Sequence, residues 1–274
     1  MTQPVPPRQA DPTAERSISL DVDAGVATIT INRPRAGNAL DIDAARRLWE
    51  ATTKVDQSAD VRCVVLTGAG RAFCAGGDVK GFSQAGDAAP TLLKESTVYL
   101  HAAISQLSRM AKPLITAVNG AAAGAGMGLA LLGDIVLVAD TAFFTTAYSA
   151  IGLSPDGGVS WLLPRLVGLR AAQEMILTSR KISASEALKR GMVSHIVPAA
   201  DLAEQARGFA DRLARLSPHA LGEARSLLLS SYGASLEAHL ELEARAISRM
   251  SGTPFARAQS AAFARSARSG EAKA

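Results

Sequence analysis

One acidic residue stands in a stretch of sequence that can hold it in a fixed place. Asp156 lies within SPDGGVSW (154–161), between a proline and two glycines, and an apolar segment follows it. Proline presets φ, aspartate bonds nearby backbone groups and glycine accepts positive φ, so the stretch is typical of a helix-capping turn. A carboxylate at the edge of an apolar pocket is also suited to acid/base catalysis. The residues alone leave both interpretations open.

Two segments rich in small residues supply a second kind of chemistry. They are GAGRAFCAGGDVKGF (68–82) and AVNGAAAGAGMGLALLGD (117–134). Neither completes a dinucleotide-binding fingerprint, because Phe73 and Leu129 stand where the third glycine belongs. Small residues where a loop enters a helix leave backbone N–H groups free, and two N–H groups directed at one oxygen form an oxyanion hole. Tight packing of a helix on a sheet needs the same residue types, and spacing alone favours that role.

The remaining reactive side chains form no recognisable constellation. Cys74 adjoins the first small-residue segment, but no histidine is placed to activate it as a nucleophile. Cys63 and Cys74 have no metal-ligand spacing, so we expect no metal site and a reducing compartment, the cytoplasm. The four histidines are scattered, which is typical of surface or structural residues: His101, His195, His219 and His239.

Composition and charge exclude several classes of function. The chain has 274 residues, of which 48% are hydrophobic, so it can bury a large core. The net charge is +4, yet the basic residues are scattered and only 4% of residues are aromatic, so we expect no nucleic-acid surface. Residues 1–15 lack an apolar signal core and are expected to form a flexible tail. Asn119 and Gly120 interrupt the uncharged run 113–133, which favours a buried strand, turn and helix over a membrane span.

Short runs rich in valine and isoleucine alternate with helical patterns, which predicts an α/β fold. Ser183 and Glu186 form a capping-box signature for a short helix that Gly191 ends. After about residue 200 we expect only helices, and the composition of the last twenty residues predicts fraying. The expected strands lie at 25–31, 61–67, 114–120, 135–140 and 193–197, and the earlier helices at 43–55 and 93–110.

The two small-residue segments and INRPRAGNAL (31–40), in this order, closely resemble the crotonase family, the enoyl-CoA hydratase/isomerase superfamily, over residues 16–265. The resemblance implies a spiral of ββα repeats over 16–200 and a helical trimerisation region over 201–274. It implies an acyl-CoA thioester ligand, with coenzyme A as part of the substrate and no separate cofactor. The assembly would be a homotrimer or a dimer of trimers, without a nucleic-acid or membrane partner. By the same resemblance Gly77 and Ala125 are oxyanion donors, and contacts with coenzyme A fall on Arg35, Ala75, Asp78 and Lys80.

The chain departs from the hydratases of this family at two positions. Hydration resembles a task for two glutamates, and their positions hold Gly128 and Tyr148, neither of which is a carboxylate. The segment 151–168 resembles a subgroup that includes 1,2-epoxyphenylacetyl-CoA isomerases; there, as in dienoyl-CoA isomerases, an aspartate at the position of Asp156 shuttles a proton. We therefore predict an acyl-CoA isomerase with Asp156 as its acid/base. Hydratase or other enolate chemistry and a catalytically silent acyl-CoA-binding homologue are the alternatives, and the acyl group stays open.

Overall fold

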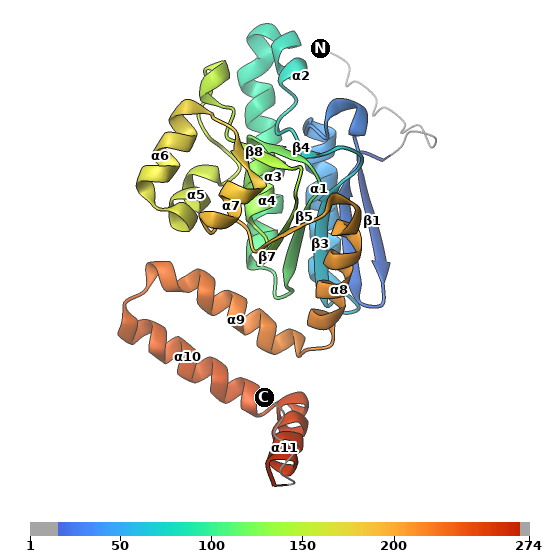
Figure 1. Ribbon diagram of the computed structural model, residues 1–274, viewed down its shortest axis with the longest axis vertical. Helices are drawn as coiled ribbons and strands as arrows, with labels where there is room; N and C mark the ends of the chain where they lie inside the picture. Colours follow the sequence, from blue (N-terminus) through green and yellow to red (C-terminus); the bar gives the residue numbers. More distant parts are fainter. Residues whose placement is uncertain (1–15, 269–274) are drawn as a thin grey trace, which may run out of the picture.

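The computed structural model describes residues 16–268 and shows two sheets surrounded by helices (Figure 1). In the larger sheet β1 and β2 are antiparallel and every other neighbouring pair is parallel. Its strand order is β1 (Ile18–Asp23), β2 (Val26–Ile31), β3 (Cys63–Gly68), β5 (Leu114–Val118), β7 (Ile135–Ala139) and β10 (His195–Val197). The smaller sheet has the order β4 (Ala72–Cys74), β6 (Ala121–Ala123), β8 (Phe143–Thr145) and β9 (Ile182–Ser183).

Three repeats of the chain each give one strand to the larger sheet, one strand to the smaller sheet, and then a helical segment. Their strand pairs are β3–β4, β5–β6 and β7–β8. The first repeat differs, because both of its strands, β1 and β2, belong to the larger sheet and precede α1 (Ile42–Gln57). This arrangement confirms the predicted spiral of ββα units. The helices that follow the three pairs are α2 (Val79–Gln84), α3 (Ala89–Arg109), α4 (Ala125–Leu131), α5 (Val159–Val167) and α6 (Leu169–Thr178).

The uncharged run 113–133 folds into β5, β6 and α4, as its interruption by Asn119 and Gly120 predicts. Every residue of β5 and of α4 is buried, which explains why the run carries no charge. The single polar residue of β5, Thr116, donates from its hydroxyl to the carbonyl of Ala130 at 2.7 Å. Within residues 16–268, no helix has both the length and the apolar character needed to cross a bilayer.

Local capping signals set where several helices begin. Asp41 caps α1 by accepting a hydrogen bond from the Ala44 N–H at 2.8 Å, and α3 begins four residues before the predicted helix because Pro90 fits its first turn. Ser183 accepts from the Glu186 N–H at 3.2 Å at the start of α7 (Ala184–Lys189). Gly191 follows that helix with a φ of 75°, which confirms the predicted end.

Four helices follow β10, as predicted for the part of the chain after residue 200. α8 (Leu202–Ala214) lies along the larger sheet, while α9 (Pro218–Ser230), α10 (Leu236–Ser251) and α11 (Pro254–Arg268) extend away from it (Figure 1). Arg225 ties α9 to the body through its Nε, 2.7 Å from an oxygen of Asp134.

The composition of the last twenty residues predicts fraying, and the structure places 255–268 of them in α11. Thr253 accepts a hydrogen bond from the Ala256 N–H at 3.2 Å and Pro254 supplies the first turn, so this helix has its own start signal. The predicted tail at 1–15 and residues 269–274 lie outside the described residues.

Candidate active site

One cavity of about 220 Å³ brings together residues from both small-residue segments and from the turn at 154–158. Asp156, Gly77, Ala125 and Ala75 all line it. Within the described part of the chain, Asp156 is the only carboxylate in the lining, which is otherwise mostly apolar. The other lining residues are Leu40, Val79, Phe82, Leu93, Ser96, Thr97, Leu100, Ala147, Tyr148, Ile151, Leu153 and Ser154.

The turn that carries Asp156 fixes the backbone in front of α5. Gly157 and Gly158 have φ values of 59° and 79°, which lie in the left-handed region that glycine tolerates. The carbonyl of Asp156 accepts a hydrogen bond from the Val159 N–H at 3.2 Å. The segment is therefore both a helix-leading turn and a support that places the Asp156 carboxylate on the cavity wall. The two interpretations left open by the sequence are compatible.

Tyr148 is the closest polar partner of that carboxylate. Its hydroxyl donates to Asp156 Oδ1 at 2.7 Å and also approaches the Asp156 carbonyl oxygen at 3.2 Å. Burial raises the pKa of Tyr148 well above its usual value, and the negative charge of Asp156 acts in the same direction. Tyr148 therefore stays protonated and serves as a hydrogen-bond donor, not as a base.

Gly128 leaves no room for a side chain. A Cβ atom built there would lie 2.0 Å from the carbonyl oxygen of Gly157, which belongs to the turn that carries Asp156. A glutamate at 128 is incompatible with this position of the turn. The resemblance places the two hydratase glutamates at positions 128 and 148. In this structure Gly128 makes room for the turn that carries Asp156, and Tyr148 donates a hydrogen bond to the Asp156 carboxylate.

The opposite wall of the cavity consists of backbone. Leu40 donates to the Gly76 carbonyl at 2.7 Å and accepts from the Asp78 N–H at 3.0 Å, so both neighbours of Gly77 are held. Ala125 is the first residue of α4, where an N–H has no partner inside the helix. In the part of the chain that the structure describes, neither the Gly77 nor the Ala125 N–H donates a backbone hydrogen bond.

Small residues in this wall are required by packing. A Cβ at Gly126 would lie 2.2 Å from the Cys74 carbonyl oxygen, and one at Gly157 would lie 3.1 Å from the Cβ of Ala125. The packing role that spacing favours is thereby confirmed. Cys74 itself is buried, and burial raises the pKa of its thiol to about 12, so it is an inert thiol at neutral pH.

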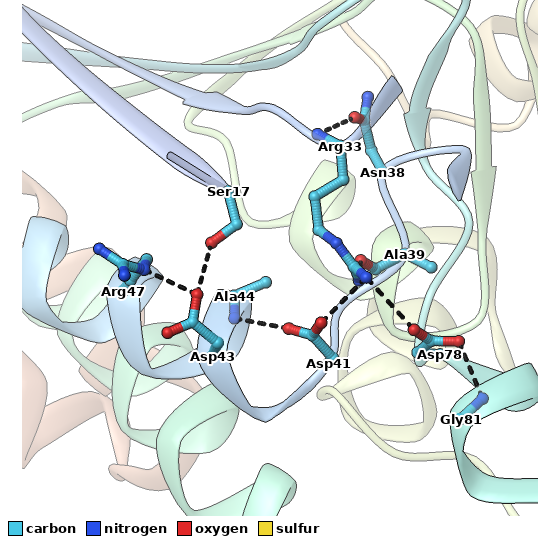
Figure 2. A network of polar contacts seen from close by, with 10 residues as sticks. All are labelled: Ser17, Arg33, Asn38, Ala39, Asp41, Asp43, Ala44, Arg47, Asp78 and Gly81. Atoms are coloured by element: carbon cyan, nitrogen blue, oxygen red, sulfur yellow. Dashed lines mark hydrogen bonds and ion pairs between the residues drawn. The ribbon is translucent and has the colours of Figure 1, made fainter. Parts of the chain in front are cut away.

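The loop before α1 contains a polar network centred on Arg33 (Figure 2). The guanidinium lies 2.9 Å from a carboxylate oxygen of Asp41 and 3.4 Å from one of Asp78. Asp78 also caps α2 by accepting from the Gly81 N–H at 3.1 Å. The buried Asn38 side chain accepts from the Arg33 N–H at 2.9 Å and donates to two carbonyls of the next loop. The network joins the loop before α1 to the loop that contains Gly77.

The four residues expected to contact coenzyme A are placed differently. Ala75 is exposed on the cavity wall, and its N–H donates to the Gly37 carbonyl at 3.0 Å. Two of the residues are exposed cations: Arg35 in a 3-10 turn at Pro34–Ala36 and Lys80 in α2. Among the described residues, neither belongs to the cavity lining. The carboxylate of Asp78 is already engaged by Arg33 and Gly81.

Sequence reasoning missed the position of His101. This residue of α3 lies beside the turn at 154–158, with its Nε2 3.9 Å from Asp156 Oδ2 and 3.4 Å from the Gly157 N–H nitrogen, which donates to it. Its side chain is 52% exposed. The contact joins residues far apart in the chain, so no local pattern marks it. Within residues 16–268, no group of three histidine, cysteine or acidic side chains is arranged to hold a metal ion.

Comparisons with known proteins identify the family of the chain. The sequence profile of the enoyl-CoA hydratase/isomerase family matches residues 21–264. The chain is 38% identical to a 1,2-epoxyphenylacetyl-CoA isomerase of Escherichia coli K12 over 84% of this chain and 88% of the relative. It is 32% identical to a 4-chlorobenzoyl coenzyme A dehalogenase of an Arthrobacter species over 88% of each chain.

A solved structure shares the same architecture. The crystal structure of an enoyl-CoA hydratase from Polaromonas sp. JS666 has a TM-score of 0.86 and 33% identity, covering 90% of this chain and 96% of that one. The family profile, the relatives and the shared ββα spiral converge on one assignment. This chain is a member of the enoyl-CoA hydratase/isomerase family, with the crotonase fold.

Proposed function

We propose that this enzyme is an acyl-CoA isomerase that moves a proton through a thioester enolate. The observation that carries the proposal is the position of Asp156, whose carboxylate faces the cavity with one oxygen 2.7 Å from the Tyr148 hydroxyl. A single carboxylate is sufficient for this reaction, because the base that removes a proton from one carbon returns it to another. The 38% sequence identity to a 1,2-epoxyphenylacetyl-CoA isomerase supports the same class of reaction. It also makes an aromatic ring-derived acyl group the first candidate for the acyl part of the substrate.

In the proposed reaction Asp156 takes a proton from a carbon of the acyl group. The electron pair of the broken C–H bond moves to the thioester oxygen, which accepts hydrogen bonds from the N–H groups of Gly77 and Ala125. The protonated Asp156 then delivers its proton to a second carbon, and the enolate electrons form the new double-bond arrangement. We assign Arg35 and Lys80 to the phosphates of coenzyme A because both are exposed cations, and Ala75 and Asp78 to its adenine end.

Hydration is the second candidate, since several relatives are called probable enoyl-CoA hydratases. It needs a carboxylate pair to hold and activate a water, and the space at Gly128 is taken by the Gly157 carbonyl. An absorbance assay with crotonyl-CoA separates the two candidates. The isomerase proposal expects little or no hydration.

The test of the proposal is the Asp156→Asn variant, with a panel of acyl-CoAs in deuterated buffer and mass spectrometry of the products. Asparagine keeps the shape of the side chain but is no base, so we expect exchange and isomerisation to fall by about three orders of magnitude, with acyl-CoA binding retained. Asp140→Asn is the matched control, because Asp140 is exposed after β7 and its carboxylate accepts a hydrogen bond from the Ala199 N–H, away from the cavity lining. Full activity of Asp156→Asn contradicts the proposal. Binding without exchange by the wild type supports a catalytically silent homologue.

The homotrimer, or dimer of trimers, is also kept as a proposal. Its support is the row of large apolar side chains that α10 exposes, including Leu236, Leu240 and Ile247. Several large apolar side chains exposed on one helix are typical of a protein interface. Sedimentation measurements that give a monomer at micromolar concentration would contradict it.

A further inference from the structure

The two oxygens of the Asp156 carboxylate have different surroundings. Oδ1 accepts the short hydrogen bond from Tyr148, whose residue is only 8% exposed. Oδ2 faces His101, with 3.9 Å between it and the ring Nε2. One oxygen is therefore fixed from the protein interior, and the other has a titratable neighbour that reaches solvent.

His101 approaches Asp156 from outside the cavity. Within the described residues it does not belong to the cavity lining, whereas Asp156 and Tyr148 do. An acyl-CoA that fills the cavity excludes water from the substrate side of Asp156. The His101 side chain is half exposed, so the side of the Asp156 carboxylate that faces it remains connected to solvent when the cavity is occupied.

The hydrogen bond made by His101 shows which of its ring nitrogens can accept a proton. Its Nε2 accepts the hydrogen bond from the Gly157 N–H, and a ring nitrogen that accepts a hydrogen bond carries no proton. Once Asp156 has taken a proton from the substrate, its Oδ2–H can donate to this nitrogen. Closing the 3.9 Å gap to hydrogen-bond length takes a movement of about 1 Å, which is the tightening expected when a catalytic site binds its substrate.

We infer that His101 is the route by which the proton carried by Asp156 exchanges with solvent. After the C–H bond breaks, Asp156 holds the substrate proton on Oδ2 and passes it to Nε2, which releases the hydrogen bond from the Gly157 N–H as it is protonated. The other ring nitrogen, Nδ1, then gives its proton to water. The reverse transfer returns a solvent proton to Asp156, which delivers it to the second carbon. His101 thus sets what fraction of the product carries a solvent-derived hydrogen, without being needed for the transfer between the two carbons. This inference rests on the proposed isomerase function.

The test measures hydrogen origin and rate in one experiment. The probe is 3-hexenoyl-CoA in deuterium oxide, and the deuterium content of the 2-hexenoyl-CoA product is read by mass spectrometry at low conversion. For His101→Leu we expect about fivefold less deuterium in the product and an isomerisation rate within about threefold of wild type. His101→Gln restores a polar side chain but no proton acceptor, so it should behave like His101→Leu. His219→Leu is the matched control, an exposed histidine on α9.

The outcomes separate the inference from the proposed function. Wild-type deuterium content in His101→Leu or in His101→Gln overturns the inference, as does a complete loss of isomerisation in His101→Leu. If Asp156→Asn keeps the wild-type rate, or if the wild type isomerises neither this probe nor any of the acyl-CoA panel, the proposed function fails and the inference fails with it. Far-ultraviolet circular dichroism of each variant checks that the fold is kept.

Discussion

The two walls of the cavity are built in different ways. The wall at Gly77 and Ala125 presents backbone N–H groups, and the neighbouring Gly76 and Gly126 have no room for a side chain, since an added Cβ would lie 2.8 Å and 2.2 Å from backbone oxygens. The wall at Asp156 presents a side chain, held by Tyr148 and by a turn whose backbone fills the space above Gly128. In the proposed reaction the first wall stabilises the negative oxygen of the thioester enolate, and the second wall supplies the group that transfers the proton.

After the loss expected for Asp156→Asn, the next largest effect is expected where the two walls meet, at Gly128. In Gly128→Ala the new Cβ would lie 2.0 Å from the Gly157 oxygen, so the turn and Asp156 must move away from the opposite wall. A misplacement of about 1 Å costs about 100-fold in rate, and the overlap should lower the free energy of unfolding by about 1–3 kcal/mol. Isomerisation rates and thermal unfolding measure the two effects.

Gly222→Ala supplies the control for that experiment. Its Cβ would lie 2.8 Å from both the Cβ and the carbonyl oxygen of Ala111, a smaller overlap made by a glycine of α9, and Gly222 does not line the cavity. We expect lower stability with a normal rate. If Gly128→Ala kept the wild-type rate, the linkage between Gly128 and the Asp156 turn would be wrong.

The two walls also differ in how far the sequence could predict them. Strands β2, β3, β5, β7 and β10 and the small-residue wall follow from local signals: apolar periodicity, caps, and glycines where a loop enters a helix. The ββα spiral was expected only from the resemblance to the crotonase family, because no local pattern marks how the repeats stack. The sequence also indicated Asp156, through the missing carboxylates at Gly128 and Tyr148. The contacts of Asp156 with Tyr148 and His101, and the partners of Arg33, were not predictable, because they join side chains whose approach depends on how separate elements pack.

A smaller effect is expected from Tyr148→Phe, which tests the side-chain wall alone. The variant removes the hydrogen bond to Asp156 Oδ1 and leaves the ring in place. A hydrogen bond to a charged group contributes about 1.5–3 kcal/mol, so kcat should fall about 10- to 100-fold with little change in KM. Tyr99→Phe is the control, because Tyr99 packs against Trp49 between α3 and α1. Unchanged kcat in Tyr148→Phe would show that the turn positions Asp156 without help.

The smallest effect is expected on the free energy of unfolding at alkaline pH. Each wall has one buried group that loses a proton in this range, so the two contributions can be measured separately. Cys74 lies under the backbone wall and accepts a hydrogen bond from the Gly76 N–H at 3.4 Å, while Tyr148 lies under the side-chain wall. Burial raises the pKa of both groups above their unfolded values, which are about 9 for the thiol and about 10 for the phenol. Stability is therefore fully present below the unfolded pKa and is lost as the pH rises above it.

The pH at which the free energy of unfolding begins to fall distinguishes the thiol from the phenol. The pKa of Cys74 in the folded state is about 12, so at pH 10 its contribution to the free energy of unfolding should have fallen by roughly 1 kcal/mol. The measurement is denaturant unfolding between pH 8 and about 11 in a Cys63→Ala background, because burial raises the pKa of Cys63 to about 12 as well. Adding Cys74→Ala should flatten the pH dependence from pH 9 upwards, whereas Tyr148→Phe should flatten it only above pH 10. Identical onsets for the two variants would contradict the assignment of the loss to these two groups, since the onset is set by their different pKa values in the unfolded chain.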